Sequence, residues 1–105
     1  MSEFSNVTVV KAANVYFDGK VNSRTIQFAD GTTKTLGFML PGDYAFNTDA
    51  AEVMEILSGE LEVLLPGEKG WLAVQGGESF AVPASSSFKL KIQKAIDYCC
   101  SFIQD

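Results

Sequence analysis

The chain contains no histidine, and among its 105 residues it has only two cysteines and three prolines. The absence of histidine removes the commonest general base near neutral pH and the commonest metal ligand. The two cysteines, Cys99 and Cys100, are adjacent. Neighbouring cysteines rarely form a disulfide, because its geometry is hard to satisfy across one trans peptide. We therefore expect two reduced, buried thiols and no metal site.

Positive charge is also scarce, with 8 Lys and Arg against 13 Asp and Glu, for a net charge of −5. Partners such as nucleic acid and anionic membranes require clustered cations, so neither is expected. The start, MSEFSNVTVV, lacks the basic and long apolar regions of a secretory leader. No apolar run approaches the roughly 18 residues of a membrane-spanning helix. We expect a cytoplasmic protein.

The residues that are abundant indicate a folded domain. Hydrophobic residues make up 47% of the chain and include eight phenylalanines. A chain of this length can bury about 60 to 65% of the surface that its unfolded form exposes. Since no linker, repeat or low-complexity run divides it, we expect one domain over residues 1–105 that folds without metal or disulfide.

Alternating polar and apolar residues, separated by turn residues, indicate an all-β protein. Turns are expected at DG, PG, SG, PG and GG, at residues 30–31, 41–42, 58–59, 66–67 and 76–77. So many short strands favour a sandwich or a small barrel. The predicted strands are 7–10, 15–17, 20–28, 33–40, 44–48, 53–57, 60–65, 71–74, 79–82, 88–92 and 97–103.

The alternation also predicts which side chains point inward. In FKLKI, residues 88–92, the apolar residues share one face and the lysines share the other. The same reasoning points Tyr44, Phe46 and Thr48 inward. It places Glu55 on the face opposite Glu52.

The strand KVNSRTIQF, residues 20–28, is less regular. Lys20 and Arg24 share a parity that would point a cationic end of the strand into a cavity. Val21 has the opposite parity, and a bulge would shift the phase. The sequence leaves both orientations of Arg24 open.

Two segments have the spacing of a metal-binding motif pair without its ligands. In GDYAFNTDAAEVMEILSG, residues 42–59, the ligand positions hold Thr48, Ala50 and Glu52. The second segment, GESFAVPASSSF, covers residues 77–88. The pair resembles the two motifs of a cupin, a small double-sheet β-barrel or jelly roll.

The resemblance extends further. The runs NVYFDGKVNSRTIQFADGTTKTLGFMLPGDYAFNT, EVMEILSGELEVLLPG, GGESFAVP and YCCSF are similar to the pyrimidine/purine nucleoside phosphorylase family of cupins, over residues 14–103. Membership would imply a homodimer that cleaves purine and pyrimidine nucleosides with phosphate. The products would be a free base and a pentose 1-phosphate. Inorganic phosphate would be the co-substrate, with no metal or other cofactor.

Such a reaction must hold an anion, orient a ribose and accommodate a base while positive charge develops on the sugar. Lys20, Ser23, Arg24 and Thr35 are the predicted phosphate ligands. Arg24 is preferred because a guanidinium matches phosphate oxygens, although a solvated strand edge explains these cations equally well. Arg24 and Glu52 form the predicted catalytic set.

Glu52 stands at the position of the cupin carboxylate ligand, where sugar hydroxyls or Arg24 could pair with it; a solvated glutamate is the alternative. Aromatic and apolar inward positions would line a base pocket or only fill the core. Trp71 is expected only to pack. The predicted substrate-binding residues are Tyr44, Phe46, Thr48, Glu52, Met54 and Phe88.

Two other classes of function compete with a phosphorylase. A cupin barrel can hold a small ligand without catalysing a reaction, and fold alone does not separate these possibilities. A metal-dependent cupin oxygenase or isomerase is disfavoured, because Glu52 with Thr48 is a poor ligand set for a first-row metal.

Overall fold

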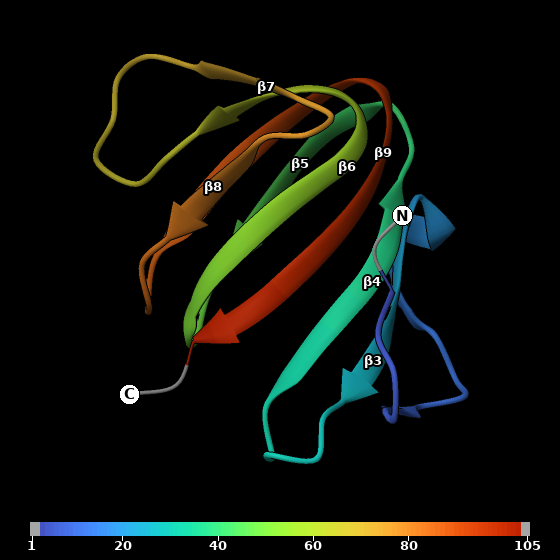
Figure 1. The fold of residues 1–105 in the computed structure, drawn as a ribbon. Coiled ribbons are helices and arrows are strands. Elements are labelled where there is room, and N and C mark those ends of the chain that lie inside the picture. The colour runs from blue at the N-terminus through green and yellow to red at the C-terminus, as the bar shows by residue number, and fades with distance from the viewer. Residues whose placement is uncertain (1–2, 104–105) are drawn as a thin grey trace.

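The computed structural model describes residues 3–103, which form a nine-stranded antiparallel β-structure (Figure 1). A short 3-10 turn, η1, lies between the second and third strands. The all-β prediction is confirmed. The strands are β1 (Thr8–Val9), β2 (Asn14–Tyr16), β3 (Val21–Gln27), β4 (Thr33–Met39), β5 (Gly42–Asn47), β6 (Ala51–Leu64), β7 (Leu72–Gln75), β8 (Ser79–Val82) and β9 (Ser87–Ile103), with η1 at Phe17–Gly19.

Two long, curved strands, β6 and β9, run side by side and organise the fold (Figure 1). The first part of β9, residues 87–92, also pairs with β5, whereas residues 96–101 pair with β4. Strand β6 divides in the same way, with residues 52–55 paired to β8 and residues 60–63 to β7. Each long strand therefore belongs to two parts of the sheet, which curves around the core.

The change of partners coincides with irregular pairing between β6 and β9. The register shifts between Ile56 and Ser58, between Ser58 and Glu60, and again after Glu60. Gly59, within this irregularity, has a φ of +103°, which side-chain-bearing residues rarely adopt. A Cβ at Gly59 would also collide with the Ala95 carbonyl oxygen and lie 2.7 Å from Ile96 Cδ1. The bend thus depends on a residue without a side chain.

This bend accounts for the main errors of the predicted strands. Ser58-Gly59 was predicted to be a turn between two strands, but it lies inside the continuous strand β6. Residues 88–92 and 97–103, predicted as two strands, are both part of β9. A glycine that interrupts the alternation of polar and apolar residues is typical of both a turn and a bulge. The sequence therefore did not distinguish a turn at Ser58-Gly59 from a bulge within one strand. Trp71 lies just outside β7.

The core lies between the facing sides of the curved sheet. Leu61, Val63, Leu90 and Ile96 are almost completely buried. Burial of each such side chain contributes about 1.5 to 3 kcal/mol relative to exposure. Cys99 and Cys100 are buried and free, as predicted. Among residues 3–103, no helix is long and apolar enough to cross a membrane.

We expect Gly59→Ala to lower the free energy of unfolding by about 2 to 4 kcal/mol, because both the backbone conformation and the space at this bend exclude a Cβ. Urea unfolding measures the change. Gly70→Ala is the matched control, since a Cβ there meets nothing within 4 Å and its φ is not in the positive range. Equal unfolding midpoints for the two variants would contradict the role of Gly59.

Candidate active site

A cavity of about 410 Å³ opens between the two parts of the curved sheet. Phe46 of β5 and Phe88 at the start of β9 form its aromatic side, and the side chains from β3, β4, β6 and the end of β9, which form its polar side, include hydroxyls, a thiol and a carboxyl group. Residues from β2 to β6 and from β9 contribute. The lining residues are Tyr16, Val21, Ser23, Thr35, Met39, Phe46, Asn47, Asp49, Glu52, Met54, Phe88, Tyr98, Cys100 and Phe102.

The aromatic side is built on neighbouring strands. Phe46 of β5 and Phe88 of β9 are direct cross-strand partners, and their rings stack with centroids 5.6 Å apart and planes 26° apart. Phe17, from η1, packs edge-on against Phe46 at 5.5 Å. Stacked pairs of this kind stabilise the fold beyond their buried area and present a flat apolar wall.

The polar side depends on a close approach between β4 and Tyr98. A Cβ at Gly37 would lie 2.7 Å from the Tyr98 hydroxyl and collide with the Asn22 carbonyl oxygen. The absent side chain leaves room for the phenol, whose hydroxyl donates to the Asn22 carbonyl at 3.4 Å. Burial raises the pKa of Tyr98 to about 12. Tyr98 therefore stays neutral near pH 7.

Hydroxyl groups of β3 and β4 face the same space. Ser23 is buried, and its Oγ accepts a hydrogen bond of 3.2 Å from Asn14 Nδ2. Thr35, the cross-strand neighbour of Cys100, is partly buried. Their hydroxyls are suited to hydrogen-bonding a polar ligand.

Two carboxyl groups line the cavity in different environments. Glu52 is half-buried on β6, between Val82 of β8 and Phe102 of β9 in the strand register. Burial raises the pKa of Glu52, although a hydrogen bond from the Cys100 thiol partly opposes the change. Asp49 is exposed in the loop between β5 and β6. Of the two positions that the sequence left open for Glu52, the structure shows the one that lines the cavity.

The two thiols lie on opposite faces of β9. Cys100 lines the cavity beside Glu52, whereas Cys99, its neighbour in sequence, has the opposite parity. Burial, together with nearby Glu55, raises the pKa of Cys99 to about 11. Burial and the neighbouring Glu52 carboxylate raise the pKa of Cys100 above that. Both thiols are therefore protonated at neutral pH.

The predicted site residues divide between the cavity and other places. Ser23, Thr35, Phe46, Glu52, Met54 and Phe88 all line the cavity. Tyr44 points inward as predicted, but its hydroxyl donates to the Leu40 carbonyl at 2.7 Å and its ring does not line the cavity. Thr48 is buried, and its hydroxyl donates to the Pro83 carbonyl at 2.7 Å and accepts from the Ser86 amide.

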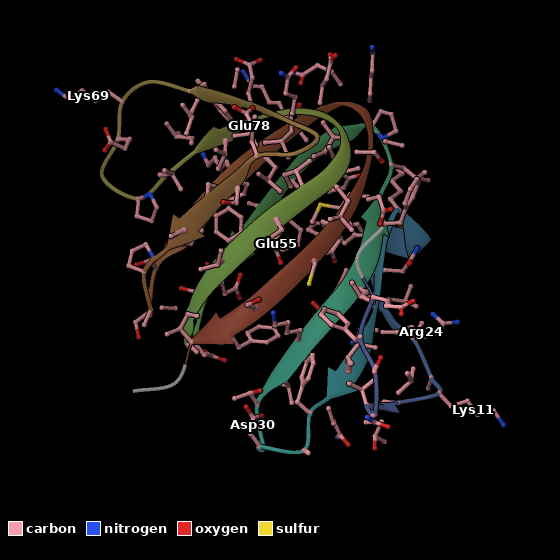
Figure 2. The ribbon with its side chains drawn as sticks, viewed as in Figure 1. Lys11, Arg24, Asp30, Glu55, Lys69 and Glu78 are labelled. Carbon is pink, nitrogen blue, oxygen red and sulfur yellow. The ribbon has the colours of Figure 1, made fainter. Side chains whose placement is uncertain are left out.

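The cationic candidates lie outside the cavity. Lys20 and Arg24 are exposed, and Figure 2 shows Arg24 directed outward, away from β6 and β9. Of the two orientations of β3 that the sequence left open, the one that points Lys20 and Arg24 inward is wrong. Val21 and Ser23 are the buried residues, because the strand takes the phase set by Val21. Among the described residues, no Lys or Arg lines the cavity.

Metal binding has no matching set of residues in the described part of the chain. Within residues 3–103, no three or more Asp, Glu, Cys or His side chains are placed to hold a metal ion. Thr48, at one of the ligand positions of the cupin-like motif, instead forms hydrogen bonds that link the loop before β6 to the loop before β9. The prediction of catalysis without a metal rests on the donor set and awaits a test.

The sequence of the chain matches those of known proteins. Residues 11–102 match the family model described as pyrimidine/purine nucleoside phosphorylase. The chain belongs to the pyrimidine/purine nucleoside phosphorylase family. A relative of that name from Chlorobium chlorochromatii is 66% identical over 103 residues, which cover 98% of this chain and 99% of the relative. Another from Hydrogenovibrio crunogenus is 62% identical over 103 residues, with 98% and 99% covered.

Solved structures share this fold. A protein of unknown function (DUF1255) from Acinetobacter sp. ADP1 is similar with a TM-score of 0.93 and 43% identity, and 96% of this chain and 98% of that chain are covered. An RmlC-like cupin from Shewanella frigidimarina has a TM-score of 0.69 at 16% identity, with 96% and 86% covered. The second likeness shows the fold alone. The predicted cupin fold is confirmed.

Several residues of this family member's cavity were not found from the sequence. Tyr98 and Cys100 were assigned to a closing strand and to packing, Asp49 was passed over, and alternation assigned Asn47 to the face opposite Phe46. The inward parity of Tyr98, Cys100 and Phe102 along residues 97–103 was readable. Which inward positions face a cavity rather than the packed core depends on the bend, and alternation does not encode it.

Both thiols should react slowly with a soluble aromatic disulfide reagent at neutral pH, because only the thiolate attacks and burial disfavours it. We expect the folded protein to react at least about tenfold more slowly than the same protein in concentrated guanidinium chloride. Absorbance of the released thiolate gives the rates. Rapid release of one equivalent from the folded protein would show that a cysteine is accessible and reactive.

Proposed function

We propose that the protein is a nucleoside phosphorylase of broad specificity. It cleaves the N-glycosidic bond of purine and pyrimidine nucleosides with inorganic phosphate and releases a free base and a pentose 1-phosphate. No metal or other cofactor takes part. The observation that carries this proposal is a cavity with an aromatic wall and a hydroxyl- and carboxyl-bearing wall, in a chain of this family.

The aromatic wall suits a base of either class. Phe46 and Phe88 offer stacked ring faces, and stacking on an aromatic side chain tolerates any base because every base has a π-face. Met54, which is buried and also lines the cavity, adds adaptable apolar surface. A wall that offers no hydrogen-bonding groups does not discriminate between purine and pyrimidine edges, which supports broad specificity.

The polar wall suits the pentose and the phosphate. Ser23 and Thr35 present hydroxyls, and Asn47 is on the rim. Asp49, exposed at the rim, places its carboxyl group where the sugar becomes cationic in the transition state. We propose that the hydroxyls of Ser23 and Thr35 contact phosphate, as predicted from the sequence.

Roles in phosphate binding for Lys20 and Arg24 remain predictions. Their exposed positions on the outside favour the cavity hydroxyls instead. The same observation favours a second candidate, a cupin that binds a neutral sugar-like ligand without catalysis, since phosphate is usually held by cations.

Homodimerisation and a cytoplasmic location are also proposed. Phe38, Leu40, Leu57 and Ile103 are large apolar side chains that are between 41% and 52% exposed, and a second copy of the chain would cover some of this surface. The two free cysteines are consistent with a reducing compartment.

The first test is phosphate dependence. Purified protein incubated with uridine, adenosine or inosine should release free base only when phosphate is present, together with one pentose 1-phosphate per base. Chromatography of base and sugar phosphate measures both products. Base release that does not depend on phosphate, or binding without turnover for every nucleoside, would reject a phosphorylase.

The second test locates phosphate. Thr35→Val removes the hydroxyl at nearly constant volume, and we expect it to raise KM for phosphate about tenfold, the equivalent of one lost hydrogen bond to a charged group. Arg24→Ala is the comparison variant, from the outer face of the adjacent strand. A larger increase in KM for phosphate in Arg24→Ala than in Thr35→Val would show that phosphate binds near Arg24 and not in the cavity.

A further inference from the structure

Phosphorolysis needs a proton at the departing base, because cleavage leaves the electron pair of the C1′–N bond on the base nitrogen. Five titratable side chains line the cavity: Tyr16, Asp49, Glu52, Tyr98 and Cys100. General acids work best when their pKa is near the working pH. Tyr98, with a pKa of about 12, and Cys100, whose pKa is higher still, hold their protons too tightly.

The three remaining groups differ in surroundings. Tyr16 is 51% exposed, on the short strand β2, and Asp49 is exposed in a loop. Glu52 is on the long strand β6, which pairs on one side with β8 and on the other with β9. Its side chain is half-buried between apolar cross-strand neighbours, Val82 and Phe102. Only Glu52 combines a rigid backbone with partial exclusion of water.

The neighbours of Glu52 come from two adjacent strands. The Cys100 thiol of β9 lies beside the Glu52 carboxyl group, and Thr35 of β4 lies beside Cys100. Thr35 and Cys100 are direct register partners, so the sheet fixes this arrangement. A thiol proton beside the carboxylate stabilises the state that remains after the Glu52 proton has left.

We infer that Glu52 is the general acid of the reaction: its carboxyl group protonates the departing base, and Cys100 holds it in position. This inference rests on the proposed function and assigns a proton donor to it. Asp49 lies in the loop at the rim, where its carboxyl group would face the cationic sugar. The two carboxyl groups of the cavity thus have different tasks, set by burial and exposure.

In each turnover the Glu52 carboxyl group gives up one proton and regains one. The C1′–N bond breaks and its electron pair goes to the base, which takes the Glu52 proton and leaves neutral. A bond forms between an oxygen of HPO₄²⁻ and C1′. The pentose 1-phosphate then releases the proton that phosphate brought, and this proton restores the Glu52 carboxyl group. Burial, by raising the pKa of Glu52, increases the fraction that carries a proton near neutral pH.

The discriminating experiment compares two substrates with one variant. Inosine requires a proton on its leaving base, whereas 7-methylguanosine carries a cationic base that leaves without one. We expect Glu52→Gln to lower kcat/KM for inosine by about 10² to 10⁴, the usual contribution of a general acid. The loss for 7-methylguanosine should be less than about tenfold. Glu55→Gln, from the exposed outer face of the same strand, is the matched control and should leave both rates unchanged.

The outcomes separate the inference from the function on which it rests. An equal loss for both substrates would make Glu52 a sugar-binding or charge-stabilising group and overturn the inference. Unchanged rates for both would remove Glu52 from catalysis. If the wild type releases base from neither substrate, the proposed function itself fails. Circular dichroism of the variant confirms that it is folded.

Discussion

The bend in β6 and β9 is the feature on which the rest of the structure depends. Two long strands change partners near Gly59, where backbone conformation and space exclude a side chain. Because of this bend, the sheet forms two parts that face each other across one interior. One contains β5 and the beginning of β9, and the other contains the beginning of β6 and the end of β9. Phe46 and Phe88 lie on one side of this interior, and Glu52 and Cys100 lie on the other. The single strand β9 thus contributes to both sides, with Phe88 near its beginning and Cys100 near its end.

The cavity separates apolar stacking from polar chemistry. Its aromatic wall is continuous with the hydrophobic core, which makes it rigid and leaves few polar groups to select one base. Its polar wall has hydroxyls, a thiol and carboxyl groups, and in the described residues it has no cation. In a protein of net charge −5, such a site favours a transition state with a cationic sugar over a tightly held anion.

Most of the fold was predictable, and part of the site was. Alternation found most of the strands and the inward positions of Phe46 and Phe88, because one face of each strand must be buried. The alternation pattern was ambiguous for β3, because Val21 and Arg24 point to opposite faces and only tertiary packing decides which face is buried. The resemblance supplied the cupin fold, but it did not show that Thr48 would be taken up by loop hydrogen bonds or that Tyr98 would fill the space above Gly37.

A crystal structure of the protein with a free base and a pentose 1-phosphate bound would show directly where the reactants lie. We expect the base against Phe46 and Phe88, the pentose beside Glu52 and Asp49, and phosphate within hydrogen-bond distance of Ser23 or Thr35. Ligands found instead on the outer face beside Arg24, with this cavity empty, would contradict this arrangement.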